Sequence, residues 1–239
     1  MALPTLEYPT YEVKLTSRGK TKFRPFLVKE QKLLMMAVEG KDMENTIKTI
    51  KQIVSACVLD KIDVDALPMV DLELLFINLR ARSMGEVMEV YYKCQNPVDD
   101  KPCGMIMEIP VNLLNIKVQE EKGLTNKIAL SDTIGVGMHY PSFDLLDLLI
   151  HAKDNIDAEF VVVAGCIDYI YDKDNMHLAK DANPEELQQF VMNLPTEKYE
   201  LLKNFILKAP KVRETVKKQC SKCSYDHTFT LEGLNDFFT

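Results

Sequence analysis

Four cysteines that fall into two pairs constrain the fold of this chain more than any other feature. Eight residues separate Cys94 from Cys103, whereas Cys220 and Cys223 form a Cys-x-x-Cys motif much later in the chain. Each pair lies where one predicted strand ends and the next begins. Two hairpin tips that each offer two thiolates are the arrangement of a zinc ribbon, and four thiolates suit the borderline-soft zinc ion. The pattern therefore predicts a structural zinc site that ties the C-terminal segment to the middle of the chain.

Two other interpretations of these cysteines compete with zinc. The gap in the first pair is wider than the roughly two to four residues usual in zinc sites, so four reduced, partly buried thiols are the simplest alternative. A redox role for Cys220 and Cys223 is disfavoured, because no thioredoxin-like βαβ pattern precedes their motif. The two remaining cysteines, Cys57 and Cys166, lie on apolar helical faces, and we expect them in the core.

Composition indicates where the protein works. The chain has 239 residues, of which 46% are apolar and 27% charged, so a sizeable core is expected. No apolar stretch approaches the roughly 18 to 20 residues of a membrane span, and residues 1–11 do not resemble a signal peptide. We expect the protein in a cytoplasm, where structural disulfides rarely persist, so its six cysteines require metal binding or burial as an explanation.

The charge balance bears on possible partners. Lys and Arg number 29 and Asp and Glu number 36, which gives a net charge of −7. Such a surface does not attract phosphate backbones or anionic lipids over a distance. We therefore expect neither a nucleic-acid partner nor a membrane partner.

The N-terminal half of the chain is predicted to change from strands to helices and back to strands. Residues 1–26 read as a β-hairpin, because apolar residues alternate on both sides of the turn signal Ser17-Arg18-Gly19. Helical spacing and end signals then predict three helices, over 27–39, 42–59 and 67–84. From Glu86 the apolar period becomes two. Strands are predicted from 87 to Cys94, from Cys103 to 109, over 111–118 and over 127–138.

The C-terminal half is predicted to be helical until a final hairpin. The sequence Asn183-Pro184-Glu185-Glu186 is a strong helix start, with proline in the first turn and acids near the positive end of the dipole. Pro195 interrupts the helical pattern, and Thr196 is the predicted cap of the next helix. The expected helices cover 143–152, 158–171, 184–194 and 196–207. Strands over 212–219 and 228–231 flank the second cysteine pair.

Helices and strands are segregated along the chain, which favours an α+β fold over α/β. We expect helical subregions and an antiparallel β-sheet closed by a zinc-ribbon-like pair of hairpins. No repeat or low-complexity linker interrupts the sequence, so residues 1–239 are predicted to form a single domain. Its subregions are a hairpin with three helices, a run of strands, a run of helices and a terminal hairpin, over 1–85, 86–140, 141–209 and 210–239.

No catalytic constellation emerges from the sequence. No Gly-x-Ser-x-Gly motif or phosphate-binding loop is present, and residues 172–175 lack the glycine and final acid of a calcium loop. The four histidines are not spaced as metal or catalytic pairs. His227 follows Cys223 by four residues and is a candidate substitute ligand, although a surface or strand position is the simpler interpretation. We assign no catalytic residues and predict that the chain is not an enzyme.

Two basic residues end the third predicted helix. Arg80 and Arg82 complement the negative end of the helix dipole, which is sufficient to explain them. The alternative is a partner-facing patch that the two arginines form with Arg18, Arg24 and Lys29. On a surface that is otherwise acidic, such a patch fits an acidic protein better than nucleic acid.

Three segments together resemble a known family. They are FRPFLVKEQKLL at 23–34, DLELLFINLRARSMGE at 71–86 and the strand ending in Cys94. They resemble the baseplate hub assembly protein family of T-even-like myoviruses, which are phages with contractile tails. The resemblance implies a role in building the central hub of the baseplate, as an assembly factor, a chaperone or a hub component. It also implies contacts with other hub proteins, in the host cytoplasm or in the virion tail. An oligomer is compatible with the resemblance.

The residues that we would test as partner contacts are Arg24, Phe26, Arg80 and Arg82. The family brings no catalytic residues with it. A zinc-ribbon nucleic-acid-binding protein is the alternative, and it conflicts with the acidic charge. A cell-wall hydrolase is a third class, and it requires a carboxylate pair or an open metal site that the sequence does not contain.

Overall fold

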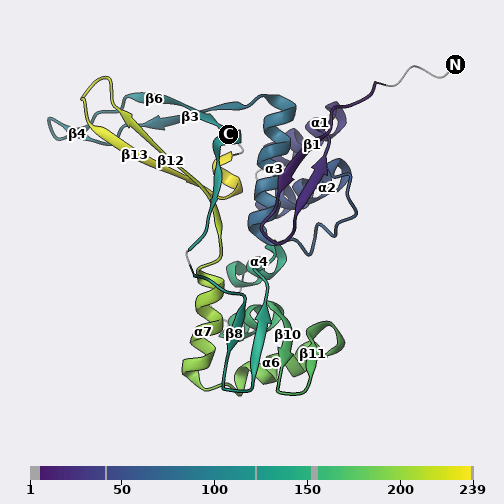
Figure 1. Ribbon diagram of the computed structural model, residues 1–239. Helices are drawn as coiled ribbons and strands as arrows, with labels where there is room; N and C mark the ends of the chain where they lie inside the picture. Colours follow the sequence, from purple (N-terminus) through teal and green to yellow (C-terminus); the bar gives the residue numbers. More distant parts are fainter. Residues whose placement is uncertain (1–5, 41, 122, 152–155, 238–239) are drawn as a thin grey trace. The chain divides into compact units, whose positions relative to one another are not determined.

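Helices and antiparallel strand pairs build the chain, which confirms the α+β class (Figure 1). The computed structural model describes residues 6–40, 42–121, 123–151 and 156–237. Contacts divide it into two compact units. The first contains the described parts of Met1–Val64, Val70–Gln119 and Lys211–Thr239, and the second contains Asp65–Met69 and Glu120–Pro210. The single domain expected from the sequence stays a prediction.

The N-terminal part of the first unit follows the sequence pattern closely. An antiparallel hairpin is followed by three helices, and the buried α3 is apolar on several sides. The predicted cap of the second helix is confirmed, because the Asp42 side chain accepts the Asn45 backbone N–H. The elements are β1 (Tyr11–Lys14), β2 (Lys20–Phe23), α1 (Val28–Glu39), α2 (Met43–Cys57) and α3 (Met69–Met84).

A buried carboxylate attaches the β1–β2 turn to α3. Asp71 is fully buried and accepts the backbone N–H groups of Thr16 and Ser17, at 2.7 and 2.9 Å. Its oxygens also accept both hydroxyl groups, at 2.9 and 2.5 Å. A buried charge is tolerated when its oxygens are hydrogen-bonded in this way.

Two long hairpins form the rest of the first unit (Figure 1). β3 (Val87–Lys93) pairs with β6 (Ile106–Asn112), and the small pair β4 (Pro97–Val98) and β5 (Lys101–Pro102) lies in the loop between them. A three-stranded antiparallel sheet has the order β13-β12-β7. Its strands are β7 (Lys117–Gln119), β12 (Lys211–Gln219) and β13 (Asp226–Glu232).

The strand predicted over 111–118 is wrong in its middle. A 3₁₀ turn, Leu113–Asn115, separates β6 from β7. The Asn112 side chain accepts the Leu114 N–H at 2.9 Å, which is a local bond that competes with strand pairing.

The second unit contains an antiparallel sheet of order β11-β10-β9-β8 with helices packed against it. Two sequence predictions fail here. The strand expected over 127–138 is a hairpin of β8 (Lys127–Ala129) and β9 (Gly135–Met138), because residues 131–134 form a turn in which the Ser131 hydroxyl accepts the Ile134 N–H. The helix expected over 158–171 ends at Gly165, and β10 (Ile167–Tyr171) follows it.

β10 escaped prediction because apolar residues continue from the end of the preceding helix into the strand. Its β-branched and aromatic side chains alternate and fit a pleated strand better than a helix. β11 (Met176–Leu178), which was not predicted, pairs with it. Two glycines of β9 face two tyrosines of β10, Gly137 opposite Tyr169 and Gly135 opposite Tyr171. A Cβ atom on either glycine would lie 2.2 Å from the facing tyrosine side chain, so glycine makes room for both.

The helices of the second unit begin largely as predicted. Asn183 caps α6 (Pro184–Met192) and shares a capping box with Glu186. Pro195, rather than Thr196, occupies the cap position of α7 (Thr196–Leu207). The helix predicted over 143–152 has its predicted end, Ala152, outside the described residues. The remaining helices are α4 (Phe143–His151) and α5 (Ile156–Gly165). Within the described ranges, no helix is both long enough and apolar enough to cross a membrane.

Candidate metal centre

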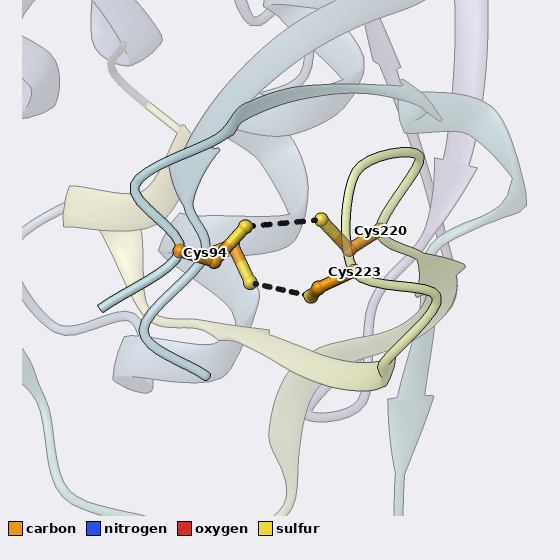
Figure 2. Close-up of side chains that lie close together, drawn as sticks. Cys94, Cys220 and Cys223 are labelled. Atoms are coloured by element: carbon orange, nitrogen blue, oxygen red, sulfur yellow. Dashed lines mark hydrogen bonds between the residues drawn. The ribbon is translucent and has the colours of Figure 1, made fainter. Parts of the chain in front are cut away.

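The four cysteines of the two predicted pairs come together in the first unit. Cys94 follows β3, Cys103 lies between β5 and β6, Cys220 follows β12 and Cys223 precedes β13. Figure 2 shows sulfur atoms from the two loops directed toward one another. The four Sγ atoms all lie within 4.8 Å of one another. The sequence prediction that the two pairs meet is therefore confirmed.

The spacing of the sulfur atoms suits a tetrahedral ion. The Sγ atoms of Cys94 and Cys223 are 3.6 Å apart, and those of Cys103 and Cys220 are 3.8 Å apart. Four ligands at the zinc–sulfur distance of about 2.3 Å have sulfur atoms about 3.8 Å apart in a tetrahedron. Three of the cysteines are buried and Cys223 is partly exposed. The cluster is compatible with zinc in both distance and donor type.

A small hairpin explains how the wide first pair closes. β4 and β5 are joined by Asp99 and Asp100, whose φ angles of 51° and 62° are both positive. Positive φ at both central residues is the signature of the tight turn that matches strand twist. The Cys103 backbone N–H also donates to the Asn96 carbonyl at 2.8 Å. The eight-residue gap is thus folded on itself, and its ends meet.

The second pair lies on a tight turn. The Cys220 N–H donates to the Tyr225 carbonyl, and the Ser224 N–H donates to the Cys220 carbonyl, each at 2.9 Å. Ser224 has a φ of 58°, which the turn requires. This geometry aims backbone N–H groups at the first sulfur of the pair.

The thiols differ in acidity. Hydrogen bonds from the backbone N–H groups of Cys223 and then Lys222 lower the pKa of Cys220 to about 6. Burial raises the pKa of Cys94 to about 12, and hydrogen bonding with the other three thiols acts in the same direction. Cys220 and Cys94 therefore do not ionise over the same pH range without a cation. A divalent ion that binds all four must displace protons, so its affinity rises with pH.

Polar neighbours surround the sulfur atoms. The His227 Nε2 atom lies 3.1 Å from Cys94 Sγ, and the Asn96 amide donates to Cys223 Sγ at 3.7 Å. The Lys222 ammonium donates to the Cys103 carbonyl at 2.9 Å. His227 is a residue of β13, as the simpler interpretation held, yet it contacts the site. The alternation of side chains along β13 places His227 on the same face as Phe229. This alternation was the sequence signal that could have placed His227 near the site.

The other two cysteines are core residues, as predicted. Both are fully buried, Cys57 in the first unit and Cys166 in the second. Burial raises the pKa of Cys57 to about 11 and that of Cys166 to about 12, so neither thiol is ionised near neutral pH.

Two of the residues proposed as partner contacts have contacts inside the first unit. Arg24 donates to the Glu30 carboxylate at 3.1 Å and to the Ala56 carbonyl at 2.9 Å. Phe26 is buried, and its N–H donates to the Ser83 hydroxyl at 3.0 Å. These contacts give both residues a structural role, and a role in partner binding stays a prediction.

Of the two arginines at the end of α3, Arg82 is exposed and Arg80 is half-buried. Arg82 donates to Glu86 at 2.7 Å, and its guanidinium lies 4.7 Å from the centre of the Tyr11 ring. Arg80 lines a groove between α1 and α3 with Leu34, Met35 and Met84. Their contact with a partner also stays a prediction.

Comparisons with known proteins cover nearly the whole chain. The family model described as "T4 bacteriophage base plate protein" matches residues 8–239. The baseplate hub assembly protein gp26 of Enterobacteria phage T4 is 28% identical over 233 residues, which are 95% of this chain and 98% of that protein. No solved structure matches.

Proposed function

This chain belongs to the T4 bacteriophage base plate protein family, and on that basis we propose that it acts in assembly of the central hub of a phage tail baseplate. Membership supports a baseplate role in general. The observation that carries the more specific proposal is the end-to-end similarity to a relative named for hub assembly. The match extends through both cysteine pairs, so it concerns the whole folded chain and not one motif.

The proposed mode of action is binding without catalysis. The partners are other baseplate hub proteins, contacted in the host cytoplasm during assembly or in the virion tail. Among the described residues, the four cysteines are the one cluster of cysteine, histidine or acidic side chains close enough to hold a metal ion, and four protein ligands would fill a tetrahedral shell. Such a shell leaves no position for a reacting water, which supports a structural role.

We propose zinc as the ion and Cys94, Cys103, Cys220 and Cys223 as its ligands. When bound, zinc supplies cross-linking and no chemistry of its own. Apparent binding free energies of structural zinc sites are about 10 to 16 kcal/mol near neutral pH, so a bound ion contributes strongly to folding. A zinc-ribbon pairing of the hairpins β3–β6 and β12–β13 is part of this proposal.

Disruption of the gene in the phage tests the function. We expect tails without a complete hub, restored when the wild-type chain is supplied from a plasmid. Normal hubs after disruption would refute the proposal. The protein content of purified virions then separates the two roles, because a hub component is present in virions and an assembly factor is absent. The alternative of a nucleic-acid-binding protein gains no support from the family or from the relative.

A further inference from the structure

The hairpin β3–β6 has apolar residues on both of its faces. One face is directed at the β12–β13 hairpin, where the rings of Tyr92 and Phe229 lie 4.1 Å apart between centres. Met88, Met107 and Ile109 share that face and are buried. The opposite face carries Val87, Tyr91 and Ile106, with exposed fractions of 58%, 63% and 61%.

An exposed apolar face of this kind needs an explanation. A sheet with one face on the core and one in water normally alternates apolar and polar residues. Here the register places Lys93 opposite Ile106, Tyr91 opposite Glu108 and Glu89 opposite Pro110, so apolar and charged side chains are interspersed on the exposed face. Exposed apolar patches with polar residues among them mark interaction sites.

The charge on this face is acidic at its centre. Glu89 and Glu108 lie diagonally across the strand pair, and the Tyr91 hydroxyl donates to Glu89 at 3.1 Å. A hydrogen bond with Glu89, and the repulsion between the two charges, raise the pKa of Glu108, while Lys218 has a weaker opposite effect. Two adjacent carboxyl groups attract an external cation.

The edges of this hairpin are also available. Within the part of the chain that the structure describes, β3 and β6 pair with each other and with no third strand. Outer backbone N–H and C=O groups of such strands can bond an added strand. A segment that docks on the outer face and continues past one edge can therefore add backbone hydrogen bonds to its side-chain contacts.

We propose that the outer face of β3–β6 is the docking surface for a segment of a baseplate hub protein that carries arginine or lysine between apolar residues. The basic side chain lies between Glu89 and Glu108 and bonds both carboxylates, and the apolar neighbours cover Val87, Tyr91 and Ile106. Arginine pairs best with two carboxylates because its planar head offers several donors. The inference rests on the proposed function, because it names the surface that a hub partner contacts.

A peptide experiment tests the chemistry of the surface. The probes are overlapping 15-residue synthetic peptides that cover the hub proteins of the same phage, measured by fluorescence anisotropy against the intact chain. We expect the bound peptides to combine basic and apolar residues. The double variant Glu89→Lys with Glu108→Lys should weaken their binding by about tenfold or more, and replacing the basic residue of the peptide by glutamate should restore binding to that variant. Binding that the double variant leaves unchanged, or no peptide bound at all, would overturn the proposal.

A matched control variant and a genetic assay distinguish failure of the docking proposal from failure of the proposed function. The control carries Glu197→Lys and Glu200→Lys on α7, which reverse the same number of charges at two exposed glutamates of the second unit. Circular dichroism and metal content check that all variants are folded. In phage lacking the gene, we expect the wild-type chain and the control to restore hubs and the double variant to fail. Restoration by the double variant would refute the surface alone, whereas normal hubs without any chain would refute the function.

Discussion

Replacing Cys220 by serine removes one of four sulfur atoms that lie within 4.8 Å of one another. We expect the purified wild-type chain to hold about one equivalent of zinc, because structural sites use four ligands. Cys220→Ser should lose most of it, as a hydroxyl is a poor ligand for this ion. Mass spectrometry of the metal content is the measurement. Cys166→Ser is the matched control, since that cysteine is buried in the second unit. A wild-type chain with little zinc would contradict the prediction.

The buried Glu73 of α3 should make the free energy of unfolding depend on pH. Burial, and then the nearby charge of Glu232, raise the pKa of Glu73 from 4.5 to about 7, despite backbone hydrogen bonds from Leu234 and Val212. Between these values the folded state binds more protons than the unfolded state. The stability that the folded state gains from binding this proton is complete below about pH 4.5 and is lost as the pH rises through 7. A difference of this size corresponds to roughly 3 kcal/mol.

Urea unfolding at pH 5 and pH 8 measures this effect. Glu73→Gln cannot ionise, so its stability should fall by roughly 2.5 kcal/mol less than that of the wild-type chain over this range. Glu197→Gln, on an exposed side chain, should behave as the wild type does. Equal pH dependence of the wild-type and Glu73→Gln chains would show that Glu73 is not responsible.

Single residues show where sequence reasoning succeeded and where it failed. The four clustered cysteines were identified because their type and their place at strand ends are visible in the sequence. The contact between His227 and Cys94 was missed, because it depends on which face of β13 meets the other hairpin. Arg24 looked like a surface residue, yet it is drawn inward by the Glu30 carboxylate. Charge alone does not reveal such burial.

Among the elements, the strand pair β9–β10 offers a direct test of packing. Gly137→Ala places a methyl group where the Tyr169 ring lies, so we expect a loss of about 1 to 3 kcal/mol. Adding Tyr169→Leu should recover part of that loss by vacating the space. Gly19→Ala is the control, since no atom lies within 4 Å of its added carbon. Thermal unfolding followed by circular dichroism gives the comparison. A Gly137→Ala chain as stable as the control would contradict the packing argument.

Elements with distinctive ends were predictable, and those without them were not. Asp42 and Asn183 cap helices whose starts were predicted, because capping is a local interaction. The boundary between α5 and β10 was missed, because a mostly apolar stretch over 160–171, with Asp168 its one charged residue, carries both elements. Pairing with β9 selects the strand, and pairing is a long-range property that periodicity does not contain.

For the whole molecule, the chain connections between the two units bear on whether the units unfold together. The chain leaves the first unit after Gln119 and returns at Lys211, and these two residues are paired in neighbouring strands. The proposal of a single domain predicts one calorimetric transition, with equal calorimetric and van't Hoff enthalpies. Scanning calorimetry of the zinc-loaded chain is the measurement. Two resolved transitions would show instead that the units unfold separately.

The two pairs of the cysteine cluster are also synthesised at different times. Cys103 and Cys220 are 117 positions apart. At about 5 to 20 residues per second, the second pair is synthesised roughly 6 to 23 s after the first. Nearly all of the second unit is translated in that interval. During those seconds the first pair has no partner pair, so a nascent chain cannot bring all four thiols together until nearly all of its second unit has been made.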